Sequence, residues 1–266
     1  MKIFWNNLLA IYRRELQSYF NSPFAYIIAM VFWVIGGFFM VFVLLSPEGL
    51  ISAVAAADQQ GLSAQSFDVP YEFLKIFLNL LGSLSMFVLP MLSMGLYAEE
   101  RKQGTLELLA TSPVTNWVVA LGKLLGVVTF YSGMLLPLIL LQLIVFSASE
   151  PAFPVKIMLL GHLGLLLLAA GVLSLGMFIS SLSDSTVLAA VMTFGVVLLL
   201  WIVEGVASAL PGPLGEALGH VSLLTHYTDF TQGIFDTSGL ILFVSNIVLG
   251  LFLTAQSIDT LRFQRS

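Results

Sequence analysis

Six long apolar runs, separated by polar or turn-forming residues, dominate the pattern of this sequence. At roughly 1.5 Å per residue, a helix formed by each run can cross about 30 Å of hydrocarbon. The pattern therefore predicts an all-α integral membrane protein with a single transmembrane domain. We place the six spans at residues 24–45, 73–97, 117–147, 155–182, 186–210 and 240–258.

The first 22 residues predict an amphipathic helix that lies in the membrane interface. The apolar side chains at helical spacing are Phe4, Leu8, Ile11, Tyr12, Leu16, Tyr19 and Phe20, and Lys2, Asn6, Arg13 and Gln17 lie largely opposite them. Asn6 and Asn7 interrupt the apolar pattern, so the segment lacks the core of a signal peptide and we expect it to be retained. Ser22 can cap the first span, and Pro23 is tolerated in its first turn.

The external segment between the fifth and sixth spans, residues 211–239, is also rich in apolar residues. Two structures fit this pattern. The segment can form two short re-entrant helices, which must then be buried in protein or line a cavity. Alternatively, it is an ordinary external loop with one surface helix.

Composition supports the membrane assignment. Hydrophobic residues make up 58% of the 266 residues and charged residues 9%, and the mean hydropathy is +0.99. Such a chain cannot bury its apolar surface in one soluble core. It has no cysteine, which excludes disulfides, thiolate metal sites and a cysteine nucleophile. Nothing in the composition indicates nucleic-acid binding.

The distribution of lysine and arginine predicts the orientation. With six spans, both termini lie on the same face as residues 98–116 and the turn at 183–185. Of the ten basic residues, only Lys75 and Lys156 fall on the opposite face. The positive-inside rule makes the basic face cytoplasmic. We therefore expect a multi-pass protein of the cell inner (plasma) membrane with both termini in the cytoplasm.

The cytoplasmic segment from Glu99 to Pro113 is the most charged part of the chain. Glu99, Glu100, Arg101 and Lys102 extend the second span beyond the membrane, and Gly104 ends that helix. Thr105 is a candidate N-cap for a short helix parallel to the membrane, which Pro113 terminates. The residues of this short helix include Leu106, Glu107, Leu108 and Leu109, with Glu107 in the first turn where the helix dipole favours an anion. Such a helix can rest in the interface or dock a cytosolic partner.

The stretch AEERKQGTLELLATSPV resembles the cytoplasmic-loop signature of type-2 ABC transporter (ABC-2) permeases. The matching positions are Glu99, Glu100, Arg101, Gly104, Thr105, Glu107, Leu108, Leu109, Pro113 and Val114. Residues Arg14–Tyr26 and Thr225–Asp236 also resemble the branch that contains the permease subunits of gliding-motility and copper-enzyme-maturation ABC transporters.

This resemblance implies an ABC-2 type permease fold in which residues 98–116 form the coupling loop that docks on an ATPase subunit. It also implies that residues 1–22, with Arg13, Arg14 and Glu15, form the connecting helix beside that loop. The implied partners are two cytosolic ABC ATPase subunits and a second permease, either another copy or a related chain. The chain has no P-loop of its own, because Gly122–Lys123 is followed by Leu124 and lacks the preceding glycine. We expect no enzymatic activity in this chain, and ATP and Mg to be bound by the partner ATPase.

Three polar residues in the spans are candidates for a translocation pathway. Glu204 lies near the outer end of the fifth span, and an ionisable group there is a functional-site hypothesis by default, although interfacial hydration explains it equally well. Gln142 and His162 are candidates that neighbouring helices can also satisfy. We expect no metal site.

Several functions remain compatible with this pattern. The first is the permease subunit of an ATP-driven exporter; the second is an ABC-type subunit that transmits ATP-driven motion to an external or periplasmic protein machine without transporting a solute. An autonomous secondary transporter or channel is favoured less, because the spans carry few charges away from their ends. A membrane enzyme finds no support in any catalytic motif.

Overall fold

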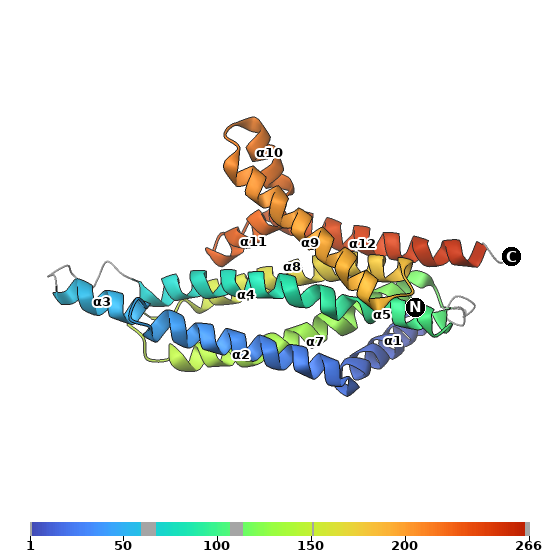
Figure 1. Cartoon of the computed structure of the whole chain (residues 1–266), viewed down its shortest axis with the longest axis horizontal. Coiled ribbons are helices and arrows are strands. Elements are labelled where there is room, and N and C mark those ends of the chain that lie inside the picture. Colours follow the sequence, from blue (N-terminus) through green and yellow to red (C-terminus); the bar gives the residue numbers. More distant parts are fainter. Residues whose placement is uncertain (1, 60–67, 107–113, 151, 264–266) are drawn as a thin grey trace.

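The computed structural model describes residues 2–59, 68–106, 114–150 and 152–263, and these residues form helices and no strand (Figure 1). The helices are α1 (Lys2–Asn21), α2 (Pro23–Leu45), α3 (Leu50–Gln59), α4 (Val69–Ser93), α5 (Gly95–Lys102), α7 (Asn116–Val145), α8 (Val155–Leu182), α9 (Thr186–Ala209), α10 (Pro213–Val221), α11 (Leu223–Thr231) and α12 (Thr237–Phe263).

Among the described residues, six helical segments are long and apolar enough to cross a membrane, so the predicted all-α fold with six spans is confirmed. They are Pro23–Ala57, Val69–Lys102, Asn116–Val145, Val155–Leu182, Thr186–Ala209 and Thr237–Thr260. The second begins earlier than the predicted residue 73, because Asp68 accepts a hydrogen bond from Tyr71 N at 3.0 Å and so starts the helix. The short helix α3 was not predicted.

Side-chain caps mark where several of these helices begin. As predicted, Ser22 Oγ accepts from Ala25 N at 3.4 Å at the start of α2. Ser185 does the same for α9, and Ser222 for α11. Each cap satisfies a backbone N–H that has no partner within its own helix, which matters where little water is present.

Helices α2, α4, α7, α8 and α12 run along the long axis of the molecule, and α9 crosses them obliquely (Figure 1). Helices α4 and α8 are the most buried spans and α9 is the least buried. The large side chains at the centre include Phe73, Phe77, Leu81 and Leu89 of α4. The start of α1, helix α5 and the last turns of α12 lie toward one end of the molecule, whereas α3 lies at the opposite end (Figure 1). This arrangement gathers α1, α5 and the start of α7 at one end of the bundle.

Residues 211–239, which are predicted to be external, contain two short helices, α10 and α11, rather than one surface helix. Helix α11 is packed into the bundle: its residues Leu223, Leu224, His226, Tyr227, Phe230 and Thr231 are all buried. Glycines on two spans make room for it. A Cβ added at Gly82 of α4 would lie 2.4 Å from Tyr227 Cε1, and one at Gly164 of α8 would lie 2.6 Å from Phe230 Cβ. The Tyr227 hydroxyl donates to the carbonyl of Leu78 in α4.

Candidate functional site

The candidate site is the end of the bundle where α5 leads into the loop that is predicted to be cytoplasmic. Helix α5 ends at Lys102, and Gly104 has a φ of +70°, a conformation that glycine adopts without strain. Gly104 N donates to Arg101 O at 3.1 Å and Thr105 N to Glu100 O at 2.9 Å. This pair of bonds is a Schellman motif, and it explains why Gly104 stops the helix as the sequence predicts.

The loop itself is described only as far as Leu106. The Thr105 hydroxyl donates to Glu100 O at 3.2 Å, and Leu106 is buried in the chain's own apolar core with 3% of its surface exposed. Glu107, Leu108, Leu109 and Pro113, which complete the predicted coupling helix, lie outside the described residues. The structure describes the loop again from Val114, and the exposed residues among its described parts are Glu99, Lys102, Gln103, Gly104 and Thr115.

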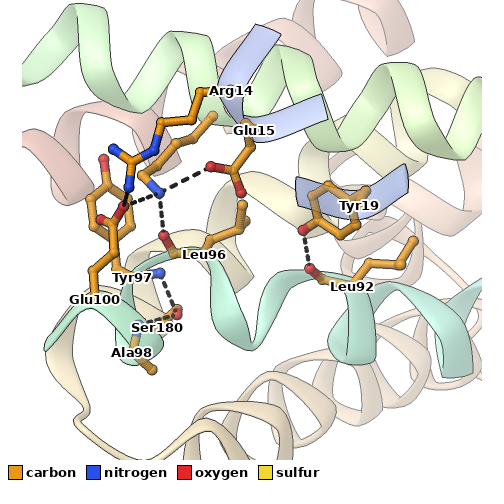
Figure 2. Close-up of polar contacts among 10 residues, drawn as sticks. Arg14, Glu15, Tyr19, Leu92, Leu96, Tyr97, Ala98, Glu100 and Ser180 are labelled. Carbon is orange, nitrogen blue, oxygen red and sulfur yellow. Dashed lines mark hydrogen bonds and ion pairs between the residues drawn. The ribbon is translucent and has the colours of Figure 1, made fainter. Parts of the chain in front are cut away.

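Glu100 does not project from the surface as a free charge but belongs to a partly buried ionic network. Lys123 Nζ of α7 donates to Glu100 Oε1 and to Glu15 Oε2, at 3.1 Å in each case. It also donates to Leu96 O at 2.7 Å and lies 4.9 Å from the centre of the Tyr97 ring. Figure 2 shows the side chains of Glu15 and Glu100 pointing toward each other from α1 and α5. The structure thus brings two of the sequence-predicted residues together through a third that we did not single out.

Helix α1 lies directly against α7 beside this network. A Cβ at Gly122 would lie 2.8 Å from Ile11 Cγ2, and one at Gly126 would lie 2.8 Å from Glu15 Cβ. These two glycines form the G-x-x-x-G pair of α7, which allows close approach of two helices. Part of the apolar face predicted to meet the membrane, including Leu8 and Leu16, therefore packs on protein instead.

The remaining predicted residues of α1 are placed differently. Arg13 is exposed, and Arg14 Nη2 lies 3.6 Å from Glu100 Oε1 with 72% of its side chain exposed, a geometry that contributes little stability. The Tyr19 hydroxyl donates to Leu92 O at 2.5 Å (Figure 2). Burial, together with the nearby carboxylates of Glu15 and Glu99, raises the pKa of Tyr19 well above its ordinary value, so this hydroxyl keeps its proton.

A second set of bonds joins α5 to α8. The helix is interrupted at Met94, between α4 and α5, and Ser180 Oγ of α8 bonds to backbone groups there. It accepts from Tyr97 N and Ala98 N at 3.0 Å each and donates to Met94 O at 2.8 Å. Arg101 Nη1 donates to Ser181 O at 2.8 Å. Arg101, predicted as part of a partner-facing cluster, is therefore engaged within the chain.

The three candidate pathway residues do not form one group. Gln142 and His162 are buried between α7 and α8, with Gln142 Nε2 3.5 Å from His162 Nε2 and His162 Nδ1 2.8 Å from Met158 O. Glu204 lies half-buried on α9. Within the described parts of the chain, no group of three or more His, Cys, Asp or Glu side chains is arranged to hold a metal ion.

The sequence contained a signal for Lys123 that we did not use. A lysine seven residues inside an otherwise apolar helix, next to the glycine of a close-packing motif, requires a charged or carbonyl partner. The count of basic residues on the predicted cytoplasmic face and the incomplete P-loop pattern at Gly122–Lys123 both include this lysine, and neither predicts its partners.

Comparison with known proteins agrees with this architecture. A family model described as ABC-2 family transporter protein matches residues 50–221, which is more than half of the chain. No curated protein matches the chain. The matched range includes Glu100, the described part of the loop and Lys123, whereas Glu15 lies outside it.

Proposed function

Since the chain belongs to the ABC-2 family of transporter proteins, we propose that it is the permease subunit of an ATP-driven exporter whose ATPase is a separate polypeptide. The family makes the chain a multi-pass membrane component of an ABC transporter. The proposal adds the direction of transport and the site at which the ATPase docks.

The observation that carries the proposal is the way the loop after α5 is attached to the spans. The loop begins with a rigid Schellman cap on Glu100, and Glu100 is joined by Lys123 to α7 and α1. A force on the loop therefore reaches three helices at their cytoplasmic ends. A coupling element requires this arrangement, whereas a loop that only rests in the interface does not.

We place the loop in the cytoplasm because eight of the ten basic residues belong to this face by sequence. In this orientation the chain lies in the inner (plasma) membrane with both termini inside, and two ATPase subunits bind ATP and Mg below it. The least buried span, α9, exposes apolar residues such as Val191, Leu199 and Ile202. A second permease subunit, together with lipid, would cover these faces.

A second candidate function is mechanical transmission to an external protein machine without transport of a solute. Helix α10 favours it: this helix lies away from α2, α4 and α7 (Figure 1) and exposes Leu214 and Val221 on the predicted outer side. An external partner could bind there. Neither function requires a catalytic group in this chain.

Photocrosslinking in native membranes tests docking. A photoreactive amino acid replaces Thr105, and the same group at Leu214 of α10 provides the matched control on the opposite side. We expect Thr105 to crosslink to a soluble protein that carries a P-loop, and Leu214 not to do so. Crosslinks from Thr105 only to lipid or to this chain would favour an autonomous transporter or channel and would contradict the docking proposal.

A further inference from the structure

Among the Lys, Arg, Asp and Glu side chains whose burial the structure describes, Lys123 alone is buried, with 4% of its surface exposed. Its ammonium has three N–H donors, and the three bonds to Glu15, Glu100 and Leu96 use all of them. A charge at this depth in an apolar helix is retained only when it is paired in this way.

The two carboxylates that Lys123 joins come from different helices. Glu15 belongs to α1 and Glu100 to α5, and their side chains are only 15% and 16% exposed. Both oxygens lie 3.1 Å from the same nitrogen. Without the ammonium, two partly buried carboxylates would face each other and repel, so α1 and α5 depend on a residue of α7 for their contact here.

Glu100 connects this network directly to the loop. Its backbone carbonyl accepts both Thr105 N at 2.9 Å and the Thr105 hydroxyl at 3.2 Å, while its side chain bonds to Lys123. A displacement of Thr105 is therefore passed through one residue to Lys123. Gly122 and Gly126, which flank Lys123 in α7, allow α1 to lie close to α7 at this point. The displacement therefore also reaches the part of α1 that contains Glu15.

We propose that Lys123 is a positioning residue that makes α1, α5 and α7 move as one unit when the cytoplasmic loop is displaced. This inference rests on the proposed coupling to an ATPase. Lys123 acts only through Glu15 and Glu100 and contacts neither nucleotide nor transported substrate. Its role is to carry the motion of the loop into α1, which the loop does not join, and to link α5 to α7 at a point within α7 rather than only through the loop that connects them.

Pulsed electron–electron resonance on the assembled complex tests the proposal. The chain has no cysteine, so spin labels at Gln17→Cys on α1 and Lys102→Cys on α5 are unique, and unlabelled chain dilutes any signal between subunits. Both positions are exposed. A second pair, Gln17→Cys with Glu216→Cys on α10, reports movement of α1 relative to the outer side.

In the wild-type background, ATP with vanadate should shift the mean distance of the second pair and leave that of the first pair unchanged. In Lys123→Met, the distance distribution of the first pair should be broader than in the wild type, and its mean should shift when nucleotide is added, which it does not do in the wild type. Lys123→Arg should restore the wild-type response, because a charged donor is kept. Lys156→Met, which removes an exposed lysine at the other end of the bundle, is the matched control.

If nucleotide leaves the mean distance of the first pair unchanged in Lys123→Met, the role of Lys123 is overturned while the proposed function stays intact. If that variant does not fold, Glu15→Gln supplies the same test, since it weakens one arm of the network and keeps the buried charge paired with Glu100. If the wild-type complex shows no nucleotide-dependent shift and Thr105 captures no ATPase, both the inference and the proposed function fail.

Discussion

At the scale of single residues, glycines determine how closely several helices approach one another. Gly122 and Gly126 admit α1 against α7, whereas Gly82 and Gly164 admit α11 between α4 and α8. In each case the added Cβ would lie within 3.0 Å of an atom of the neighbouring helix. Other glycines in the spans, such as Gly133, have no atom within 4 Å of that position. The sequence alone does not tell which glycines lie at close contacts between helices and which have open space beside them.

The contrast between Gly82 and Gly133 gives the first prediction. Both lie inside spans, so Gly82→Val and Gly133→Val change helix propensity equally, but only the first drives a side chain into Tyr227. Overpacking of this kind costs about 1–3 kcal/mol. We expect Gly82→Val to lower the thermal unfolding temperature in detergent, followed by circular dichroism, more than Gly133→Val does. Equal changes in the two variants would show that α11 is free to move away.

Lys123 shows how a single buried charge affects the residues around it. Its removal leaves two carboxylates with 15% and 16% exposure without their common partner. Removing one partner of a buried ion pair destabilises a fold more than replacing both partners by apolar residues, because the remaining charge is still desolvated. The exposed contact from Arg14 to Glu100 at 3.6 Å cannot replace this partner, since solvent screens it.

At the scale of elements, the sequence predicted the spans well and their contacts poorly. Long apolar runs determine helices in a membrane almost by themselves, because every backbone group must be satisfied within its segment. The stop at Gly104 was also predictable, since a local Schellman cap depends on neighbouring residues only. In contrast, the positions of Glu15, Glu100 and Lys123 in one network depend on packing between residues far apart in the sequence, which periodicity does not encode.

Helix α11 shows the same limit. Its apolar residues are compatible with a surface helix or a buried one, and only the facing glycines of α4 and α8 decide between them. Its neighbour α12 begins with a local cap that is readable from sequence: Asp236 accepts from Ser238 N at 3.0 Å and from the Ser238 hydroxyl. This cap gives a prediction at the level of one helix start.

The hydrogen bonds from Ser238 lower the pKa of Asp236 below its ordinary value of 3.8. A carboxyl whose pKa is lower in the folded state stabilises the fold above its ordinary pKa, and this contribution is lost as the pH falls through the lowered value. We therefore expect acidification below about pH 4 to lower the unfolding temperature of the wild type, and Asp236→Asn to show a smaller drop.

Asp229 provides a control, because its pKa is shifted in the direction opposite to that of Asp236. Burial raises the pKa of Asp229, partly offset by His226, and Asp236 raises it further. A raised carboxyl pKa contributes stability as the pH falls, because the folded state then binds the proton more tightly than the unfolded state. Asp229→Asn should therefore make the acid-induced drop steeper. Identical pH profiles for the two variants would contradict both assignments.

At the scale of the whole molecule, the chain gathers its charged network and both described ends at one end of the bundle. The start of α1 and the last turns of α12 lie toward the same end of the molecule as α5, and α3 lies at the far end (Figure 1). The centre consists of apolar side chains of α4, α7 and α8. The fold therefore separates an end that carries the charged network from an apolar interior.

The orientation of this molecule in the membrane can be tested in intact cells. The chain has no cysteine, so a single cysteine at each chosen position is the only thiol in the protein. Asp68, which caps α4, and Asp229 of α11 belong to the predicted outer end, whereas Asp184 lies in the exposed turn between α8 and α9 at the predicted cytoplasmic end.

An impermeant thiol reagent should label Asp68→Cys and Asp229→Cys in intact cells and Asp184→Cys only after permeabilisation. Because a charged reagent cannot cross the hydrocarbon core, the three positions report the topology directly. The reverse labelling pattern would place the loop after α5 outside the cell, out of reach of any cytosolic ATPase, and the proposed coupling would then be wrong.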